Sequence, residues 1–437
     1  MIIFQKSNSA ELKVCFFLYG MIILFYNWER LYFMESKIVN LDNGIELYYK
    51  KNADTPRVAL CFNCSINEPE NIPGIHSLMT RLFMQGTTTY SAEELAEELD
   101  KYAIEFAVEL KHDYLRFKFV ALNEDFPKAV EIMTDIVKNT TFDDFNKERE
   151  KMRGEIIAEL DASRTKVLEN YYKNLYEGHY YGHTYTKILE NIDKINKDDV
   201  INAYKKIISN SKKVMSFVGD LQFEDVFKEL NEKLGDVENS KDEKIGLSTP
   251  QLNEKKELEI IKPDLNQAHI VQGWFVPGFN EEDYHALLLL NIILGASGLS
   301  SRLFLELRDK KGLAYVVRSS YETLSLAANF SIYIATEPKN IEVSLQGFKE
   351  EIDKVKNIPV SLEELDNARN NILGKWAFLQ ENNNQQATLS AHYAVIGLGF
   401  DFNEKTKQRI KEVTPEQIQS CAQKYFNDKY VLSILKP

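Results

Sequence analysis

The chain has 437 residues, of which 44% are hydrophobic, 11% aromatic and 27% charged. These values exclude a disordered or low-complexity chain, and the length predicts two domains of roughly 200 residues each. Asp and Glu (66) outnumber Lys and Arg (53), giving a formal net charge of −13. An acidic surface repels phosphate backbones, so no nucleic-acid partner is expected. Four cysteines are too few for a disulfide framework and favour a cytoplasmic location.

The N-terminal part carries an apolar run at residues 14–26 (VCFFLYGMIILFY). The run is shorter than the roughly 20 residues of a spanning helix, and no small-x-small cleavage site follows it. Met34 opens MESKIVNLDNGIELYYKK, which is typical of the first strand of a soluble domain. We therefore interpret residues 1–33 as an upstream false start. A membrane anchor or an export signal is the alternative, and contact with a membrane is expected only if the run is expressed.

The first folded segments are an apolar strand at residues 58–66 and a helix that begins near residue 75. Cys61 and Cys64 are spaced like a metal-binding pair, but residues three apart on a strand point to opposite faces, so we interpret them as packing residues. The apolar side of the helix is formed by Ile75, Leu78, Met79, Leu82 and Phe83. Positions 77 and 81 are four apart and share the opposite side.

Each half of the chain then repeats one series of elements. The first half has a strand at 117–122, a helix at 126–138 and a second helix from about 143 to 161. The second half has a strand at 330–335, a helix at 341–355 and a second helix from 362 to about 380. Residues 192–220 and 410–437 also match, each with a polar cap (Asn196 or Thr414), an amphipathic helix, a turn and an apolar strand.

The duplication predicts an α+β protein with two homologous α/β-roll domains, each a mainly antiparallel sheet with helices on one face. We place these domains at residues 34–235 and 265–437. Residues 236–264 are rich in Lys, Glu and Asp, contain Pro250 and Pro263, and are interpreted as a surface linker. The apolar run at 287–294 is too short to span a membrane and predicts a buried helix.

Two segments resemble a known family, the pitrilysin, insulinase or mitochondrial-processing-peptidase family of zinc peptidases. Residues 73–87 (PGIHSLMTRLFMQGT) are similar to its active-site segment, in which an inverted zinc motif, His-x-x-Glu-His, precedes Gly-Thr. Residues 300–315 (SSRLFLELRDKKGLAY) are its most specific match. The resemblance runs from about Met34 to Pro437 and implies two domains of the LuxS/MPP-like metallohydrolase type.

Alignment on Gly-Thr puts Ser77 and Arg81 where the family has its two histidines, and Thr80 where it has the glutamate. Serine is a poor zinc ligand, a permanently charged arginine repels the metal, and threonine cannot act as a general base near neutral pH. His76 is turned about 100° around the helix and is expected to cap or pack. We therefore expect no zinc on this chain.

The resemblance puts the third zinc ligand at Glu159 and a further acidic position, seven residues earlier, at Met152. We hypothesise that Arg81 pairs with Glu159 and fills the vacated metal pocket, because an unpaired buried carboxylate is costly. The alternative is that both side chains face solvent.

A second element of the resemblance involves Arg308 and Tyr315, which are seven residues apart. A helix at 299–308 should stop near Gly312, and a strand should start at Ala314. This fold-back can bring a guanidinium and a phenol together. The resemblance implies a substrate clamp that hydrogen-bonds the peptide backbone. The alternative is a surface ion-pair arginine and a core tyrosine.

Residues 179–183 (HYYGH) have two histidines at a metal-ligand spacing, but the neighbouring glycines predict a structural loop. By resemblance, the chain is then a non-catalytic subunit that binds an unstructured peptide as an added strand, while a homologous zinc-bearing subunit cleaves it. The first alternative is a non-proteolytic peptide-binding or assembly protein of the same fold. The second is a peptidase that is active by itself through substitute ligands.

Overall fold

The computed structural model describes residues 17–18, 21–22, 36–240 and 246–437. Near the N-terminus, Phe17–Leu18 (β1) pairs antiparallel with Met21–Ile22 (β2). The remainder of the predicted extension, and most of the apolar run at 14–26, lies outside the described residues. Within the described ranges, every helix is too short or too polar to cross a bilayer.

The first half of the chain builds a six-stranded sheet in the order β3-β4-β8-β5-β7-β6. The strands are β3 (Ser36–Asn40), β4 (Glu46–Lys51), β5 (Arg57–Ser65), β6 (Glu105–Leu110), β7 (Tyr114–Leu122) and β8 (Lys213–Gly219). Only β4 and β8 run parallel among the pairs of this sheet. β5 and β8 are buried along almost their whole length, because both faces of the sheet are covered.

The second half builds a five-stranded sheet in the order β11-β12-β10-β13-β9. Its strands are β9 (Lys256–Ile261), β10 (Ala268–Val276), β11 (Ala314–Thr323), β12 (Ala328–Thr336) and β13 (Val431–Lys436). The last strand, β13, pairs in parallel with β9, as β8 does with β4. The two sheets therefore share one plan, and the predicted α+β class is confirmed.

Residues 256–261 differ from the sequence interpretation, which placed them in the linker. They form β9 and pair with β13, so the second sheet begins before residue 265. The reason is visible in KELEII, whose alternating charged and apolar residues suit an edge strand that is buried on one side only.

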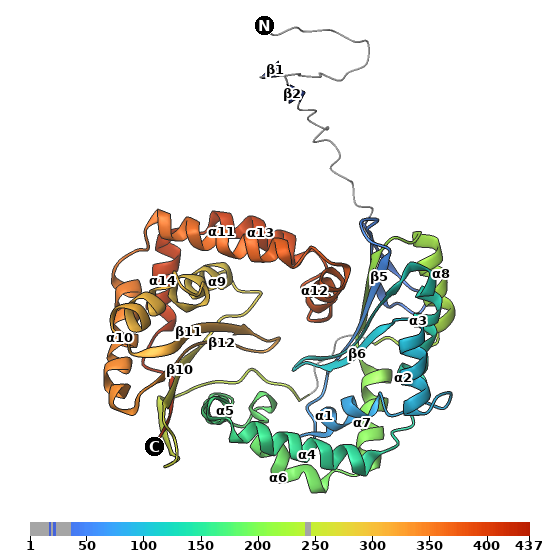
Figure 1. The fold of residues 1–437 in the computed structure, drawn as a ribbon, viewed down its shortest axis with the longest axis horizontal. Helices are drawn as coiled ribbons and strands as arrows, with labels where there is room; N and C mark the ends of the chain where they lie inside the picture. The colour runs from blue at the N-terminus through green and yellow to red at the C-terminus, as the bar shows by residue number, and fades with distance from the viewer. Residues whose placement is uncertain (1–16, 19–20, 23–35, 241–245) are drawn as a thin grey trace.

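Helices cover the outer faces of both sheets (Figure 1), and one further helix from each half packs across the inner faces. In the first half they are α1 (Ile75–Leu82), α2 (Ala92–Lys101), α3 (Phe126–Asn139), α4 (Phe145–Asp161), α5 (Ser163–Leu175), α6 (Tyr185–Asn191), α7 (Lys197–Asn210) and α8 (Phe223–Leu234). In the second they are α9 (Tyr284–Asn291), α10 (Ile341–Asn357), α11 (Leu362–Phe378), α12 (Asn383–Val395), α13 (Phe402–Glu412) and α14 (Pro415–Tyr425). The predicted caps at Asn196 and Thr414 are both confirmed as reciprocal capping boxes.

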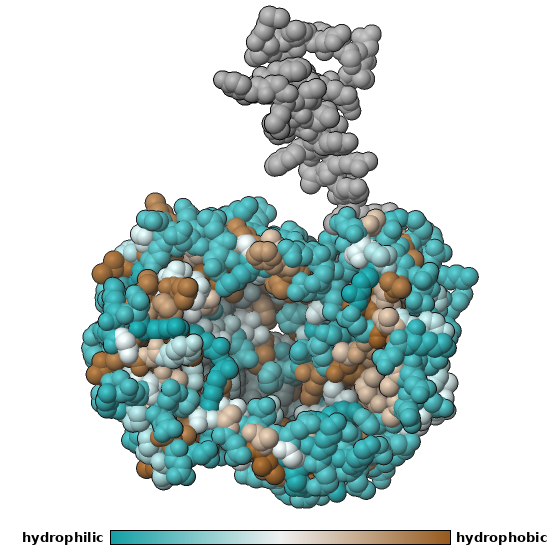
Figure 2. All heavy atoms as spheres, viewed as in Figure 1, coloured by the Kyte–Doolittle hydropathy of each residue, from teal (hydrophilic) through white to brown (hydrophobic). Residues whose placement is uncertain are grey.

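The two halves exchange one helix each across the inner faces of their sheets. α5, from the first half, packs on β10 and β13 of the second sheet, where the Tyr171 hydroxyl donates to Asn329 Oδ1 at 3.3 Å. α12, from the second half, packs on β5 and β8, and Asn52 donates to Asn383 at 2.6 Å. Figure 1 shows both helices between the sheets, and Figure 2 shows that the centre of this face is hollowed.

Candidate functional site

The first turn of helix α1 is capped by the carboxylate of Glu70. Glu70 accepts hydrogen bonds from the main-chain N–H groups of Gly74 (2.9 Å) and His76 (3.0 Å), and lies 3.3 Å from Nδ1 of His183. Gly74 has φ +103, a left-handed conformation that favours glycine. The imidazole of His76 lies 3.8 Å from Glu70, in agreement with the prediction that this histidine caps or packs.

The imidazole of His76 and the carboxylate of Glu70 are both largely buried, and each affects the pKa of the other. Burial lowers the pKa of His76 and outweighs the opposing charge of Glu70, so the imidazole is neutral at neutral pH. Burial also raises the pKa of Glu70, but the hydrogen bond from His183, the His76 charge and the main-chain N–H bonds outweigh it, and the net shift is downward. Glu70 is therefore a charged cap, and its bonds serve the fold.

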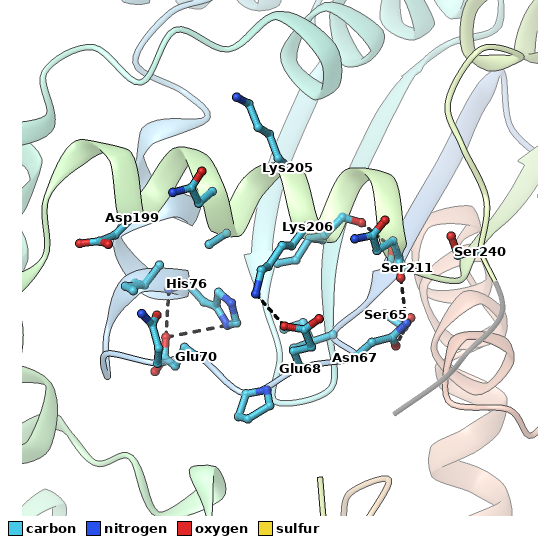
Figure 3. Close-up of a pocket in the computed structure, with 18 residues that line it drawn as sticks. Ser65, Asn67, Glu68, Glu70, His76, Asp199, Lys205, Lys206, Ser211 and Ser240 are labelled. Atoms are coloured by element: carbon cyan, nitrogen blue, oxygen red, sulfur yellow. Dashed lines mark hydrogen bonds and ion pairs between the residues drawn. The ribbon is translucent and has the colours of Figure 1, made fainter. Parts of the chain in front are cut away.

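A polar cavity of about 790 Å³ lies beside this first turn of α1 and is closed on the other side by α7. Lys206 donates to Glu68 at 2.7 Å in this cavity, and Figure 3 shows this contact and His76 turned towards Glu70. Ser77, Thr80 and Arg81 are not among its lining residues. The cavity is therefore separate from the positions that resemble a zinc motif.

Those motif positions lie further along α1 and are occupied by short or cationic side chains. The Thr80 hydroxyl donates to the main-chain carbonyl of His76 at 2.8 Å, inside its own helix. Arg81 stands in the last turn and reaches α4. Its Nη1 lies 3.6 Å from Glu148 Oε2 and 3.5 Å from Glu155 Oε1, and its Nη2 bonds the second oxygen of Glu155.

The predicted pair of Arg81 with Glu159 is therefore wrong. Glu148 and Glu155 are seven residues apart, which is two helical turns, so both face α1. Glu159 lies one turn beyond, is exposed, and lines a different cavity of about 470 Å³ between the halves. The sequence interpretation assigned this seven-residue spacing to Met152 and Glu159, which lie four residues after Glu148 and Glu155. Met152 is buried in the core.

The chemistry at this position is that of an ion cluster between α1 and α4, buried at Glu148 and open to solvent at Glu155. Glu148 is only 3% exposed and the guanidinium supplies the positive charge beside it. The hydrogen bond from Arg81 lowers the pKa of Glu155. A zinc ion needs three protein ligands and repels a fixed cation, so these residues do not fit the metal. Among the described residues, no group of three or more His, Cys, Asp or Glu side chains can hold a metal ion.

The second predicted pair, Arg308 and Tyr315, is brought together. The Arg308 guanidinium carbon lies 4.8 Å from the centre of the Tyr315 ring. Gly312, at φ +62, ends the preceding helix as predicted. Tyr315 is 76% exposed, which excludes the alternative that it fills the core.

Sequence reasoning missed Phe304, whose ring lies 4.7 Å from the Arg308 guanidinium carbon. The predicted helix at 299–308 ends instead in a π-helical turn, Phe304–Lys310. The contact could have been predicted from the sequence, because Phe304 is four residues before Arg308 and residues four apart on a helix are neighbours.

Each sheet presents an open edge to the central opening. β6 ends the first sheet and β11 ends the second, and neither outer edge has a strand partner within the described ranges. Figure 1 shows β6 and β11 on opposite sides of this opening. An open edge offers main-chain N–H and C=O groups to an extended peptide.

The remaining sequence candidates have structural roles. Burial raises the pKa of Cys61 to about 11 and of Cys64 to about 12, and the two thiols face different sides of β5. His179 accepts a hydrogen bond from the Tyr181 N–H at 3.1 Å and caps a short 3-10 turn. The predictions of packing for the cysteines and of structure for the histidine pair agree with these contacts.

Comparison with known proteins identifies relatives along most of the chain. A sequence model described as "Insulinase (Peptidase family M16)" matches residues 44–191, and one described as "Peptidase M16 inactive domain" matches residues 194–372. An "Uncharacterized zinc protease YmxG" of Bacillus subtilis is 24% identical over 401 residues, which cover 90% of this chain and 97% of the relative. A "Non-peptidase homolog YmxG" of Helicobacter pylori is 23% identical over 363 residues, or 80% of this chain and 81% of the relative.

Solved structures show the same fold. A peptidase M16 inactive domain from Pseudomonas fluorescens superposes with a TM-score of 0.83 at 19% identity, covering 92% of this chain and 98% of that one. A protease from Helicobacter pylori superposes with a TM-score of 0.84 at 20% identity, covering 92% of this chain and 100% of that one.

Proposed function

Because the chain belongs to peptidase family M16, the insulinase family, we propose that it is a non-catalytic subunit that holds a peptide for a zinc-bearing partner. The observation that carries this proposal is the position of Arg81. Arg81 stands where the resemblance puts a metal-binding histidine, and its guanidinium lies against Glu148 and Glu155. The permanent positive charge of Arg81 already balances the nearby carboxylates, so zinc is not needed to neutralise them and would be repelled.

The peptide-holding part of the proposal rests on the second half. Arg308 and Tyr315 meet at the start of β11, and the exposed phenol and the half-buried guanidinium supply donors for peptide carbonyl groups. The unpaired edge of β6 supplies a place for an added strand. An unstructured peptide meets both requirements, because its main chain is free to pair.

The proposed partner is a homologous chain that carries an intact zinc motif, and the metal belongs to that chain. The described cysteines Cys61, Cys64 and Cys421 are free thiols, which fits our proposal that the protein works in the reducing cytoplasm. Cleavage would then need both chains, and this chain would contribute binding.

The test combines metal analysis with a cleavage assay. The purified chain should carry no stoichiometric zinc and leave a fluorescent casein peptide intact, and addition of the zinc-bearing partner should produce cleavage. Arg308→Ala should weaken cleavage by the mixture, while Lys349→Ala on the outer helix α10 should not. Bound zinc and cleavage by the chain alone would refute the proposal.

A second candidate function is peptide binding or assembly without proteolysis. The printed name of the Helicobacter pylori relative, a non-peptidase homolog, favours it. Peptide binding that persists without a cleaving partner in pull-down experiments would select this alternative. Self-sufficient catalysis through substitute ligands is disfavoured, since Ser77 and Arg81 do not replace two imidazoles.

A further inference from the structure

Two π-helical turns, Ile292–Ala296 and Phe304–Lys310, lie next to β11 in the fold. In each turn a main-chain N–H reaches back five residues, from Ser297 to Ile292 and from Lys311 to Glu306. π turns are rare and occur often at functional sites. The first is held against β11, because Gly295 leaves room for the Ser319 main chain. The second carries Arg308.

The second π turn places an aromatic ring on Arg308 from within its own helix. Widening of the helix brings residues four apart more nearly into line along the axis, and the Phe304 ring lies 4.7 Å from the guanidinium carbon. The Tyr315 ring lies 4.8 Å from the same carbon. Both rings therefore contact the same guanidinium, and in the described part of the chain no ring contact joins Phe304 to Tyr315.

The guanidinium N–H groups of Arg308 have no ion-pair or hydrogen-bond partner among the described residues, and the contacts of the guanidinium there are with two aromatic rings. The N–H groups of a guanidinium point outward in its plane, so contacts of the group with two rings leave these donors free for a carbonyl or carboxylate oxygen. The two ring contacts therefore restrict a long, flexible side chain and keep its donors available.

We infer that Phe304 is a positioning residue of the clamp: it fixes the guanidinium plane of Arg308 before a peptide arrives. This inference rests on the proposed peptide-holding function. A guanidinium that is already held in place loses less conformational entropy when the peptide binds. Loss of the ring should therefore weaken peptide binding about 3- to 10-fold, even though Phe304 itself need not touch the peptide.

The experiment compares Phe304→Leu with Phe304→Tyr in the full chain, and Phe378→Leu, the same substitution at an exposed phenyl group on α11, is the control. Fluorescence anisotropy with a fluorescein-labelled casein peptide gives the affinity. Phe304→Leu should bind about 3- to 10-fold more weakly, and Phe304→Tyr and Phe378→Leu should stay within about twofold of the parent chain. Thermal unfolding of the variants shows whether any loss comes from instability.

A second measurement separates this inference from the proposed function. ¹⁵N relaxation of the Arg308 Nε–H, assigned with Arg308→Lys, reports on the free chain without any peptide. The Arg308 Nε–H should be more mobile in Phe304→Leu than in the parent chain, and in Phe304→Tyr it should be as ordered as in the parent chain. If the group is equally ordered in Phe304→Leu, the positioning role is overturned. If the parent chain binds no peptide while the relaxation behaves as expected, the proposed function fails and the placement of Arg308 by Phe304 stands.

Discussion

The carboxylate of Asp113 accepts a hydrogen bond of 2.9 Å from the main-chain N–H of Ser325. The two residues sit at the tips of two hairpins, β6–β7 in the first half and β11–β12 in the second. Asp113 is 6% exposed and also accepts from the hydroxyl groups of Tyr180 and Tyr181. One buried carboxylate thus ties together the two hairpins that carry the open edges β6 and β11.

Asp113→Ala should destabilise the protein by about 1–3 kcal/mol, because a buried Tyr181 hydroxyl and the Ser325 N–H lose their acceptor. Urea unfolding measures the loss, and hydrogen exchange should show faster exchange at Ser325. Asp113→Asn keeps one acceptor oxygen and should recover part of the stability. Unchanged stability and protection in Asp113→Ala would show that the hairpin tips are held by other contacts.

The triple variant Ser77→His/Thr80→Glu/Arg81→His should gain about one zinc ion per chain. Two histidines four apart would face α4, where Glu155 already contacts position 81. Metal analysis after dialysis provides the measurement, and Arg81→His alone is the control that should bind little zinc. Failure of the triple variant to bind zinc would mean that Glu155 does not occupy a ligand position.

Gly273→Ala should cost about 1–3 kcal/mol, because an added Cβ would lie 2.1 Å from the Tyr171 hydroxyl and 2.8 Å from the Phe330 carbonyl. Tyr171→Phe in the same chain should recover part of this loss, since it removes the nearest atom. Gly374→Ala is the control: it lies in α11 with open space around it and should be neutral or stabilising. Chemical unfolding of all four proteins tests the contact between α5 and the second sheet, and equal losses at both glycines would contradict it.

Burial, with a smaller effect of the Arg116 charge, lowers the pKa of His392 to about 4. The unfolded chain therefore binds the proton first as the pH falls, and the stability should fall between about pH 6.5 and 4 and level off below. The shift corresponds to a loss on the order of 3 kcal/mol. His392→Gln, which keeps a polar partner for the Tyr114 hydroxyl, should show a smaller loss across this window in unfolding experiments. An identical pH profile in both proteins would assign the effect to other groups.

Local sequence signals predicted the repeated units well. The helix caps at Asn196 and Thr414 and the stop at Gly312 depend on residues within one turn, so the sequence alone identifies them. The meeting of Arg308 and Tyr315 was also predictable, because a short turn joins the helix to the strand.

The partner of Arg81 could not be predicted in the same way. Glu148, Glu155 and Glu159 all lie along α4 at helical spacing, and only the crossing of α1 with α4 decides which of them meet the guanidinium. The π-helical turn beneath Phe304 has no periodic signature, because an α-helix and a π-helix tolerate the same residues over one turn. β9 was missed since an edge strand with one charged face has the composition of a linker.

The exchange of α12 has a consequence for synthesis on the ribosome. The inner face of the first sheet, with Ala59, Cys61 and Val218, is covered by Ala387 and Ala391 of α12. Translation proceeds from the N-terminus, so the first sheet is complete after β8 while its cover is still some 170 codons away, counted from Gly219 to Ala387. The nascent chain therefore exposes an apolar surface through this interval. Fragments that stop at the linker should require a chaperone to stay dispersed.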